Sequence, residues 1–435
     1  MPTKIKIIGG GLAGSEAAYY LAKRGYDVTL TDIKPKSFTP AHKSPLFGEL
    51  VCSNSLKSND VYANACGLLK EEMRILGSMI IACGDETRVP AGAALAVDRD
   101  AFAAKITEKL KSVGNIAFAC EEVEKIDPEE YTIVATGPLT TGKLCDFLEK
   151  FTGKGFYFYD AAAPIVSGDS IDFDNAFISD RYGELGKGDY VNCPIDKDGY
   201  LEFYRELTTA KRAELHDFES AKVFEGCMPV EVMAARGEDT LRFGPLKPAG
   251  LTDPKTGRWP YACLQLRKED EHGGMYNLVG FQTNLLFPEQ KRVFSLFPAL
   301  KNAEFLRYGV MHRNTYLNSP ECLNEDFSLK NHPNVFFAGQ ITGVEGYVES
   351  TASGLWAAIN LDRKLSGKES LPADNETVIG ALAKYVATKN ADFQPMNANY
   401  GVLKPLLLSP KKKADKKKEM SERALKKIKE IRKTI

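Results

Sequence analysis

The sequence lacks any long apolar run, and this absence excludes the simplest membrane topology. None of its hydrophobic segments reaches the roughly 20 residues that a membrane-spanning helix needs. The chain enters a buried-strand pattern directly, at Lys4 to Ile8, and has no stretch typical of a signal peptide. We therefore expect a cytoplasmic protein with no membrane partner.

Paired cysteine motifs are also missing. Nine cysteines are scattered over 435 residues without a CxxC pair, which argues against a structural zinc site. Their odd number argues against a complete disulfide framework. The sequence therefore predicts thiols rather than disulfides, and no metal site.

Net charge is almost absent, but the charges are unevenly distributed. The formal charge is −1, yet residues 411–435 hold twelve Lys/Arg and four Asp/Glu, so this tail carries +8 and the remainder −9. Basic segments of this kind bind nucleic-acid phosphates, although a solvated terminus without a partner has the same composition. We expect a helix from Glu422 to Arg432 within a basic C-terminal tail, residues 409–435.

The N-terminus carries the pattern of a dinucleotide-binding unit. A buried strand, Lys4 to Ile8, is followed by the glycine-rich turn Gly9 to Gly14 and by a helix that ends near Gly25. A second strand from Asp27 leads to Asp32, about 20 residues beyond the glycines. There an acidic side chain can bind ribose hydroxyls while the helix N-terminus receives the pyrophosphate.

Two distant segments favour FAD over a nicotinamide as the bound dinucleotide. Thr132 to Gly137 and Asn334 to Gln340 both predict β-strands that end in glycine, and they look like later flavin-contact motifs. A purely nicotinamide-binding unit would not need both. After the second segment, a glycine-punctuated turn leads into a helix through Trp356, whose N-terminus can face the flavin or its pyrophosphate. An ordinary strand-to-helix turn is the alternative.

The length exceeds what one hydrophobic core usually supports, which predicts two lobes. Short strand patterns separated by Pro- and Gly-rich turns fill the middle of the chain. We predict an α/β fold in which a Rossmann-like FAD-binding domain of the large flavoprotein class carries an inserted α+β substrate domain. The predicted parts are residues 1–139 and 330–408 for FAD, 140–329 for the insertion and 409–435 for the tail.

Cys52 stands among polar residues in the segment Val51 to Asn59. A reactive thiol needs a polar or positive environment because the thiolate is the nucleophile, whereas a structural cysteine sits in apolar packing. Covalent chemistry beside a cofactor is predicted, with a chance loop cysteine as the alternative. Cys227 is the second candidate, upstream of Arg236 and Arg242, and there a buried structural cysteine is the alternative.

Ten separated segments carry a family signature: GGGLAGSEAA at 9–18, TPAH at 39–42, ELVCSNSL at 49–56, NCP at 192–194, EGCMPVE at 225–231, RFGPLKPAGL at 242–251, EQKRVF at 289–294, RYGVMHRNTY at 307–316, FFAGQITGVEGYVES at 336–350 and PMNANYG at 395–401. In these segments the chain closely resembles the TrmFO family, the folate- and FAD-dependent uracil-5 methyltransferases of bacterial tRNA. The resemblance covers nearly everything up to about Leu406.

The resemblance implies methylation of the T-loop uridine 54 of tRNA to 5-methyluridine. In this family 5,10-methylenetetrahydrofolate gives the carbon, reduced flavin gives the hydride, flavin N5 is thought to carry the methylene, and NADH or NADPH is the reductant. Uracil C5 becomes nucleophilic only after a thiolate adds at C6. Cys52 and Cys227 are then the catalytic pair, and we prefer Cys227 as the nucleophile and Cys52 as the proton-handling partner, with the reverse assignment open.

The flavin-contact motifs give the predicted cofactor-binding residues: Gly9, Gly10, Gly11, Leu12, Ala13, Gly14, Asp32, Thr136, Gly137, Gly339, Gln340, Gly346, Tyr347 and Val348. Arg307, His312 and Arg313 are candidates for contacts with RNA phosphate or the folate glutamate, with a structural ion pair as the alternative.

Asn284 departs from the family pattern, which has histidine at this position, and Lys57 stands where arginine is usual. The change at Asn284 puts the folate-side contacts in doubt. Together with the basic tail, it leaves a uridine of 23S rRNA open as the target, although tRNA is preferred. A small-molecule FAD oxidoreductase and a non-catalytic RNA-binding flavoprotein are the remaining alternatives. A monomer is preferred over an oligomer.

Overall fold

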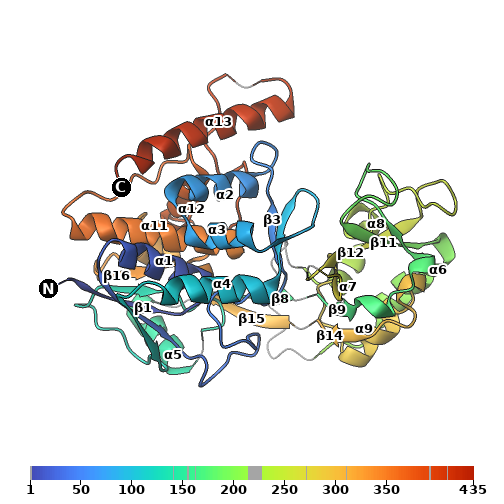
Figure 1. Cartoon of the computed structure of the whole chain (residues 1–435), viewed down its shortest axis with the longest axis horizontal. Coiled ribbons are helices and arrows are strands. Elements are labelled where there is room, and N and C mark those ends of the chain that lie inside the picture. Colours follow the sequence, from blue (N-terminus) through green and yellow to red (C-terminus); the bar gives the residue numbers. More distant parts are fainter. Residues whose placement is uncertain are drawn as a thin grey trace.

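The computed structural model describes residues 2–140, 142–153, 156–161, 163–213, 228–270, 272–309, 311–390, 393–408 and 410–435 (Figure 1). These residues form two lobes. The N-terminal and C-terminal parts of the chain share the larger lobe, and the middle of the chain forms the smaller one. Cys227 lies outside the described residues.

A five-stranded parallel sheet forms the centre of the larger lobe, with the strand order β16-β7-β1-β2-β6. Ile5, Ile7 and Ile8 of β1 are all buried, as expected for a parallel strand covered on both faces. The chain first extends the sheet on one side of β1 and later on the other, so the carboxyl end of β1 lies at a topological switch point, where open α/β sheets bind ligands. The strands are β1 (Lys4–Ile8), β2 (Asp27–Asp32), β6 (Ile116–Cys120), β7 (Thr132–Val134) and β16 (Val335–Phe337).

Helices cover this sheet, and a small antiparallel sheet of order β3-β5-β4 lies beside them. Helices α1 and α11 pack closely because Gly354 of α11 has no side chain: a Cβ there would lie 2.3 Å from the carbonyl oxygen of Ala13 in α1. The elements are α1 (Leu12–Lys23), β3 (Ser55–Ser58), α2 (Ala65–Leu76), α3 (Met79–Glu86), β4 (Arg88–Val89), β5 (Ala94–Val97), α4 (Arg99–Lys111), α5 (Gly142–Thr152), α10 (Ser319–Cys322), η6 (Gln340–Thr342), α11 (Tyr347–Leu365), α12 (Val378–Ala387) and α13 (Lys413–Arg432).

The smaller lobe contains a six-stranded sheet of order β10-β11-β12-β13-β9-β14, in which each pair of neighbouring strands is antiparallel. Helices pack on it around an aromatic cluster of Phe203, Phe281, Phe294 and Phe297. Its elements are β9 (Ile165–Ser167), η1 (Gly168–Ser170), η2 (Phe173–Asn175), β10 (Phe177–Ile178), β11 (Tyr190–Ile195), α6 (Lys197–Thr209), α7 (Val230–Ala234), α8 (Thr240–Phe243), β12 (Ala262–Lys268), β13 (Met275–Leu278), α9 (Phe287–Phe294), η5 (Pro298–Leu300) and β14 (Phe305–Arg307).

The two lobes have separate hydrophobic cores. The core of the smaller lobe takes residues from Val166 to Ala303, whereas Leu144, Leu148 and several residues of 316–329 pack in the core of the larger lobe. The two-stranded ladder of β8 (Phe156–Ala161) and β15 (Met311–Tyr316) connects the regions on either side of the insertion. The domain limits at 140 and 329 remain a prediction.

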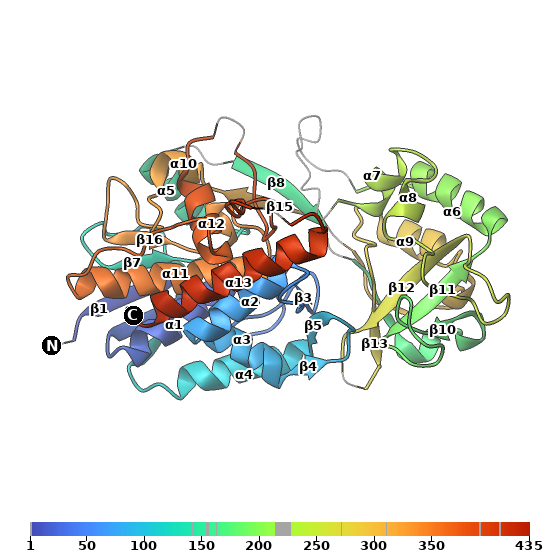
Figure 2. The same ribbon diagram turned by 90° about the horizontal axis from the view of Figure 1, so that it is seen from above.

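The C-terminal tail is a docked helix rather than a solvated end. α13 begins at Lys413, nine residues before the predicted start at Glu422, and lies across the larger lobe beside α2 (Figure 2). Met420, Ala424, Ile428 and Ile431 are spaced along one face of this helix and are buried against the lobe. The lysines therefore lie on a rigid, packed element.

Two buried carboxylates join helices of the larger lobe. Glu16 on α1 accepts hydrogen bonds of 2.8–3.0 Å from the Ser78 hydroxyl and from the two backbone N–H groups that begin α3. Glu72 on α2 accepts from the two N–H groups that begin α12, at 2.8 and 2.9 Å. Burial raises the pKa of Glu16 to about 7 and that of Glu72 to about 8.

The local elements predicted from the sequence are confirmed for β1 and α1, and for the strand β16 that leads into α11. β2 spans Asp27–Asp32, so the second strand ends at Asp32 as predicted. No helix in the described ranges is long and apolar enough to cross a bilayer.

Candidate active site

A cavity of about 320 Å³ opens at the carboxyl ends of the parallel strands. It runs from Glu121, Glu122 and Val123 beside β6, past the glycine-rich turn after β1, to Val51 and Tyr347. The cavity therefore connects the sheet's switch point with the segment that carries Cys52.

The glycines of the glycine-rich turn differ in their surroundings. Gly9 has φ +106°, and a Cβ on it would lie 2.3 Å from the Ala135 carbonyl oxygen. A Cβ on Gly14 would lie 1.9 Å from the Gly9 carbonyl oxygen, so both residues are required by packing. A Cβ on Gly11 would meet nothing within 4 Å, because Gly11 faces the cavity. α1 begins directly after Gly11 without a side-chain cap, which leaves its first N–H groups available for an anion.

Asp32 lines the same cavity. Its Oδ2 accepts the Gly10 N–H at 2.6 Å, and its Oδ1 accepts the Lys34 N–H at 2.8 Å. A carboxylate has further lone pairs, so these contacts orient Asp32 and leave it able to accept hydroxyl hydrogens. Its contact with a ribose remains a prediction.

Most of the predicted cofactor-binding residues share this cavity. The lining includes Gly9, Gly10, Gly11, Leu12, Ala13, Asp32, Thr136, Gly137, Gly339, Gln340 and Tyr347. Three predicted residues do not line it. Gly14 is packed beneath the turn, Val348 lies in the hydrophobic core, and a Cβ on Gly346 would meet the Glu349 carboxylate at 2.3 Å.

The shape and chemistry of this cavity fit FAD. Open space at Gly11 and the uncapped start of α1 suit a pyrophosphate, and the long cavity leaves room for a nucleoside at one end and a ring system at the other. The cofactor-binding residues are thus placed together, and their individual contacts remain predictions.

Cys52 lies at the Tyr347 end of the cavity. Its Sγ is 2.9 Å from the Tyr347 Oη, and its backbone N–H donates to the same oxygen at 2.8 Å. Burial raises the pKa of Tyr347 well above its ordinary value, so the phenol keeps its proton. The phenol oxygen accepts the N–H, and either side chain can be the donor in the contact between the hydroxyl and the sulfur.

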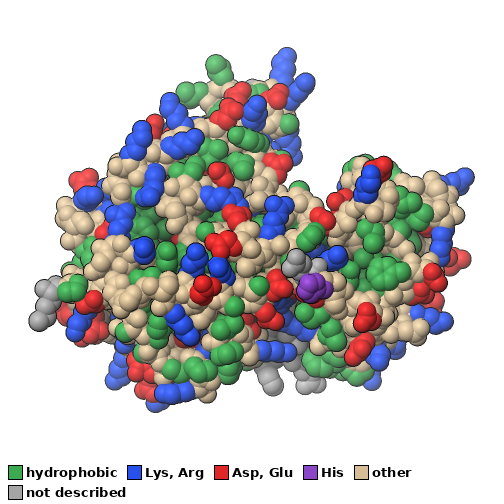
Figure 3. Space-filling view, in the orientation of Figure 1, with side chains coloured by type: hydrophobic (Ala, Val, Ile, Leu, Met, Phe, Trp, Pro, Cys, Tyr) green, Lys and Arg blue, Asp and Glu red, His purple; other side chains and the backbone are tan. Residues whose placement is uncertain are grey.

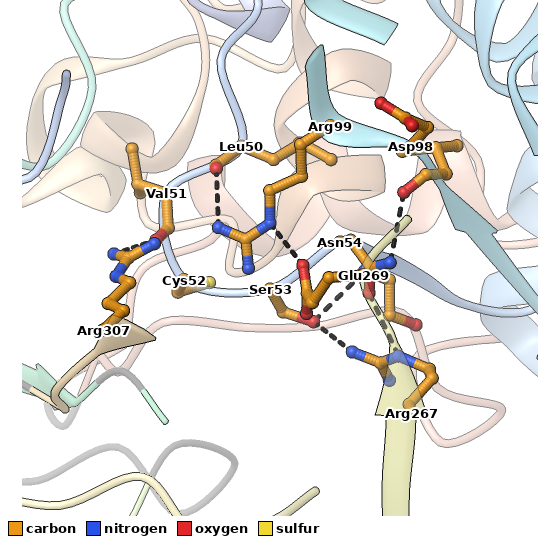
Figure 4. A network of polar contacts seen from close by, with 12 residues as sticks. Leu50, Val51, Cys52, Ser53, Asn54, Asp98, Arg99, Arg267, Glu269 and Arg307 are labelled. Atoms are coloured by element: carbon orange, nitrogen blue, oxygen red, sulfur yellow. Dashed lines mark hydrogen bonds and ion pairs between the residues drawn. The ribbon is translucent and has the colours of Figure 1, made fainter. Parts of the chain in front are cut away.

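Three arginines surround the Cys52 loop, Leu50 to Asn54 (Figure 4). Arg99 begins α4, whereas Arg267 and Arg307 belong to β12 and β14 of the smaller lobe. Both lobes thus contribute charge to the surroundings of one thiol. Sequence reasoning missed Arg99 and Arg267 because nothing local connects them with Cys52. Arg307 donates to the Val51 carbonyl oxygen, and its contact with RNA or folate remains a prediction.

The second predicted catalytic residue, Cys227, lies outside the described residues, and so do the side chains of His312 and Arg313. The chain that follows Cys227 is anchored to the smaller lobe: the Val230 N–H donates to the Gln282 carbonyl oxygen at 2.7 Å. Convergence of Cys52 and Cys227 remains a prediction.

Asn284 has a structural role in this molecule. Its backbone N–H donates to Glu231 at 2.7 Å, and its side-chain amide donates to the Ala213 carbonyl oxygen at 3.1 Å. The side chain is 5% exposed. Asn284 therefore ties together the two described ends of the segment that contains Cys227.

In the described part of the chain, no cluster of three or more His, Cys, Asp or Glu side chains could hold a metal ion.

Comparison with known proteins gives a consistent result. Residues 4–369 match the family described as glucose inhibited division protein A. A protein of Acetivibrio thermocellus named methylenetetrahydrofolate-tRNA-(uracil-5-)-methyltransferase TrmFO is 55% identical over 98% of both chains. A Bacillus licheniformis protein of the same name is 52% identical over the whole of both chains.

Solved structures confirm the fold. The chain matches Aquifex aeolicus GidA in its form I crystal with a TM-score of 0.73 and 16% identity, covering 100% of this chain and 76% of that one. The form II crystal gives a TM-score of 0.72. The predicted α/β flavoprotein fold, a parallel Rossmann-like sheet with an added sheet domain, is therefore correct.

Proposed function

Because this chain belongs to the TrmFO family of methylenetetrahydrofolate-tRNA-(uracil-5-)-methyltransferases, we propose that it methylates C5 of a tRNA uridine with the carbon of 5,10-methylenetetrahydrofolate. The T-loop uridine is the proposed position. The observation that carries the chemistry is the placement of Cys52 against Tyr347, which itself lines the dinucleotide cavity. A thiol at that point lies where a uracil beside the cofactor would react.

The reaction requires two protein groups. Uracil C5 is a poor nucleophile until a thiolate adds to C6 and makes C5 enolate-like. We assign this attack to Cys227 and the handling of the C5 proton to Cys52. Reduced FAD, when bound, supplies the hydride that converts the methylene to methyl. NAD(P)H is the proposed source of its electrons.

The remaining residues bind and orient. The glycine-rich turn and the start of α1 would hold the pyrophosphate, and Asp32 would hold the ribose. Tyr347 contacts both the backbone N–H and the sulfur of Cys52. Such preorganisation keeps the thiol in one geometry while substrate enters.

We also propose that RNA lies along α13. Lys417 donates to the Ala63 carbonyl oxygen at 2.7 Å, and Ser421 donates to the Val61 carbonyl oxygen at 3.0 Å. These contacts tie the lysine-rich start of α13 to the turn that follows β3, close in the chain to the Cys52 loop. The space-filling view shows Lys and Arg side chains gathered over the α13 end of the larger lobe (Figure 3). A phosphate backbone on this surface would be led toward the thiol.

The rRNA alternative rested on Asn284 and on the basic tail. Asn284 is buried and holds the smaller lobe together, so it does not indicate a different RNA. α13 is docked on the larger lobe and suits any RNA backbone. Neither feature favours rRNA over tRNA.

The test is label transfer. The purified chain is incubated with FAD, carbon-labelled methylenetetrahydrofolate and either unmodified tRNA or a 23S rRNA transcript, with NADH and NADPH in separate reactions. Mass spectrometry then maps 5-methyluridine. Label in the tRNA T-loop supports the proposal, and its loss in Cys52→Ala and Cys227→Ala supports their roles. Label only in rRNA refutes the tRNA target, and label in neither refutes the methyltransferase.

A further inference from the structure

Three guanidinium groups converge on the Cys52 loop, Leu50 to Asn54, and Arg99 differs from the other two in its hydrogen bonding (Figure 4). Arg307 donates to the Val51 carbonyl oxygen. Arg267 donates to the Ser53 hydroxyl at 2.8 Å and to the Asn54 side-chain oxygen at 3.0 Å. These two arginines fix the polypeptide on either side of the thiol.

Two of the three nitrogens of the Arg99 guanidinium donate hydrogen bonds to described residues. Its Nε donates to Glu269 Oε2 at 2.6 Å and its Nη1 to the Leu50 carbonyl oxygen at 3.2 Å. Its Nη2 is buried and has no partner within the described residues, and the same holds for Glu269 Oε1. A buried N–H of a guanidinium without an acceptor is costly. An anion beside it would remove that cost.

Cys52 is the group positioned to be that anion. The Arg99 guanidinium is close enough to Cys52 to interact with it electrostatically, and Figure 4 draws the two side chains facing each other. The phenol of Tyr347 contacts the same sulfur at 2.9 Å, and it is the donor when the sulfur is a thiolate. A cation and a hydrogen-bond donor at one sulfur both favour a thiolate.

The charged groups around the thiol agree with this reading. Arg99, Arg267 and Arg307 face it from both lobes, and Glu269 is the one carboxylate of the labelled network that reaches Arg99. Although burial lowers it, the pKa of Arg99 is raised above its ordinary value, because the effects of Glu269, Tyr347 and Cys52 together outweigh that of burial. Arg99 therefore stays protonated. The positive charges outnumber the negative one.

We propose that Arg99 is a positioning residue that holds Cys52 as a thiolate in the resting enzyme, with the Tyr347 hydroxyl donating to the same sulfur. The proposal rests on the proposed methylation and assigns its proton-transfer step. The C5–H bond of the uracil adduct breaks, and its electron pair forms the exocyclic double bond as the methylene carbon leaves its carrier nitrogen. The proton goes to Cys52 Sγ, which becomes a thiol.

The test measures thiol reactivity and needs neither folate nor RNA. The full-length flavin-bound protein is treated with iodoacetamide from pH 5 to 10, and alkylation of Cys52 is followed by peptide-resolved mass spectrometry. We expect half-maximal reactivity below the ordinary thiol value of about 8.5. Arg99→Gln should lower the rate at pH 7 by about tenfold or more, and Arg99→Lys should restore most of it.

Glu269→Gln is the matched control, because it breaks the same ion pair but keeps the Arg99 charge. A merely structural role predicts that Arg99→Gln and Glu269→Gln slow alkylation alike, and that outcome overturns the proposal. We expect Glu269→Gln to react at least as fast as wild type. Where Arg99→Gln does not fold, Glu269→Gln decides, and a slower reaction than wild type overturns the proposal. A failed methylation assay leaves this readout intact, so the two ideas fail separately.

Discussion

The Tyr347 hydroxyl oxygen lies 2.9 Å from Cys52 Sγ and accepts the Cys52 backbone N–H at 2.8 Å. One phenol at the start of α11 therefore sets both the position of the Cys52 loop and the hydrogen bonding of its thiol. The contact joins two residues that are 295 positions apart in the sequence.

Tyr347→Phe should reduce methylation while the chain remains folded. A hydrogen bond to a charged group is worth about 1.5–3 kcal/mol, which corresponds to a loss of roughly 10- to 100-fold in kcat. Turnover is measured together with the flavin absorbance of the purified protein. Tyr26→Phe is the control, because the Tyr26 hydroxyl donates to Asp362 at 2.8 Å, away from the thiol. Equal activity of the two variants would contradict the assigned role.

Gly11→Ala and Gly14→Ala should separate cofactor binding from folding. Gly11 has ordinary extended φ and open space at its Cβ position, so Gly11→Ala should melt normally without FAD but bind FAD more weakly. A Cβ on Gly14 would lie 1.9 Å from a carbonyl oxygen, so Gly14→Ala should lower Tm even without FAD. Thermal melts and FAD titrations give both quantities. Unchanged FAD affinity in Gly11→Ala would argue against a pyrophosphate at this turn.

The two ends of α13 should differ in RNA binding. Replacing the exposed Lys411, Lys412, Lys413 and Lys418 by alanine should weaken tRNA binding and reduce its salt dependence by about one unit of slope for each lost phosphate contact. The control removes four exposed charges at the other end of the helix, at Lys426, Lys429, Arg432 and Lys433. Affinity is measured across a salt series. The proposed path for RNA is wrong if both variants lose affinity equally.

Glu72 should make stability depend on pH. Burial raises its pKa from 4.5 to about 8, so the folded chain keeps a proton that the unfolded chain loses between these values. Its contribution to the free energy of unfolding is therefore complete below about pH 4.5 and declines as the pH rises toward 8. Glu72→Gln should flatten this decline. Urea unfolding at pH 5, 6, 7 and 8 measures it, and parallel curves for the two proteins would refute the linkage.

The parts of the fold that sequence predicts best are those with local signals. Ile5, Ile7 and Ile8 of the first strand are buried, and Gly9 and Gly14 of the turn that follows have no room for a Cβ. The docking of α13 was missed although Met420, Ala424 and Ile428 recur at helical spacing, because the lysine runs dominated the interpretation.

The thiol environment could not be predicted in this way. Arg99, Arg267 and Arg307 belong to three elements in two lobes, and no period or motif connects them with Cys52. The partner of the Cys52 sulfur, Tyr347, was predicted only as a flavin contact. Such contacts arise from the way the lobes pack, which local patterns do not encode.

The interleaving of the chain also dictates an order of assembly. β16 completes the edge of the parallel sheet and α11 packs against α1, yet both leave the ribosome only after the whole inserted lobe has been made. Until then α1 can pack against β2, α3 and α4, but the surface that contacts α11 has no cover. All six strands of the smaller lobe's sheet are therefore synthesised before β16, the last strand of the larger lobe's parallel sheet.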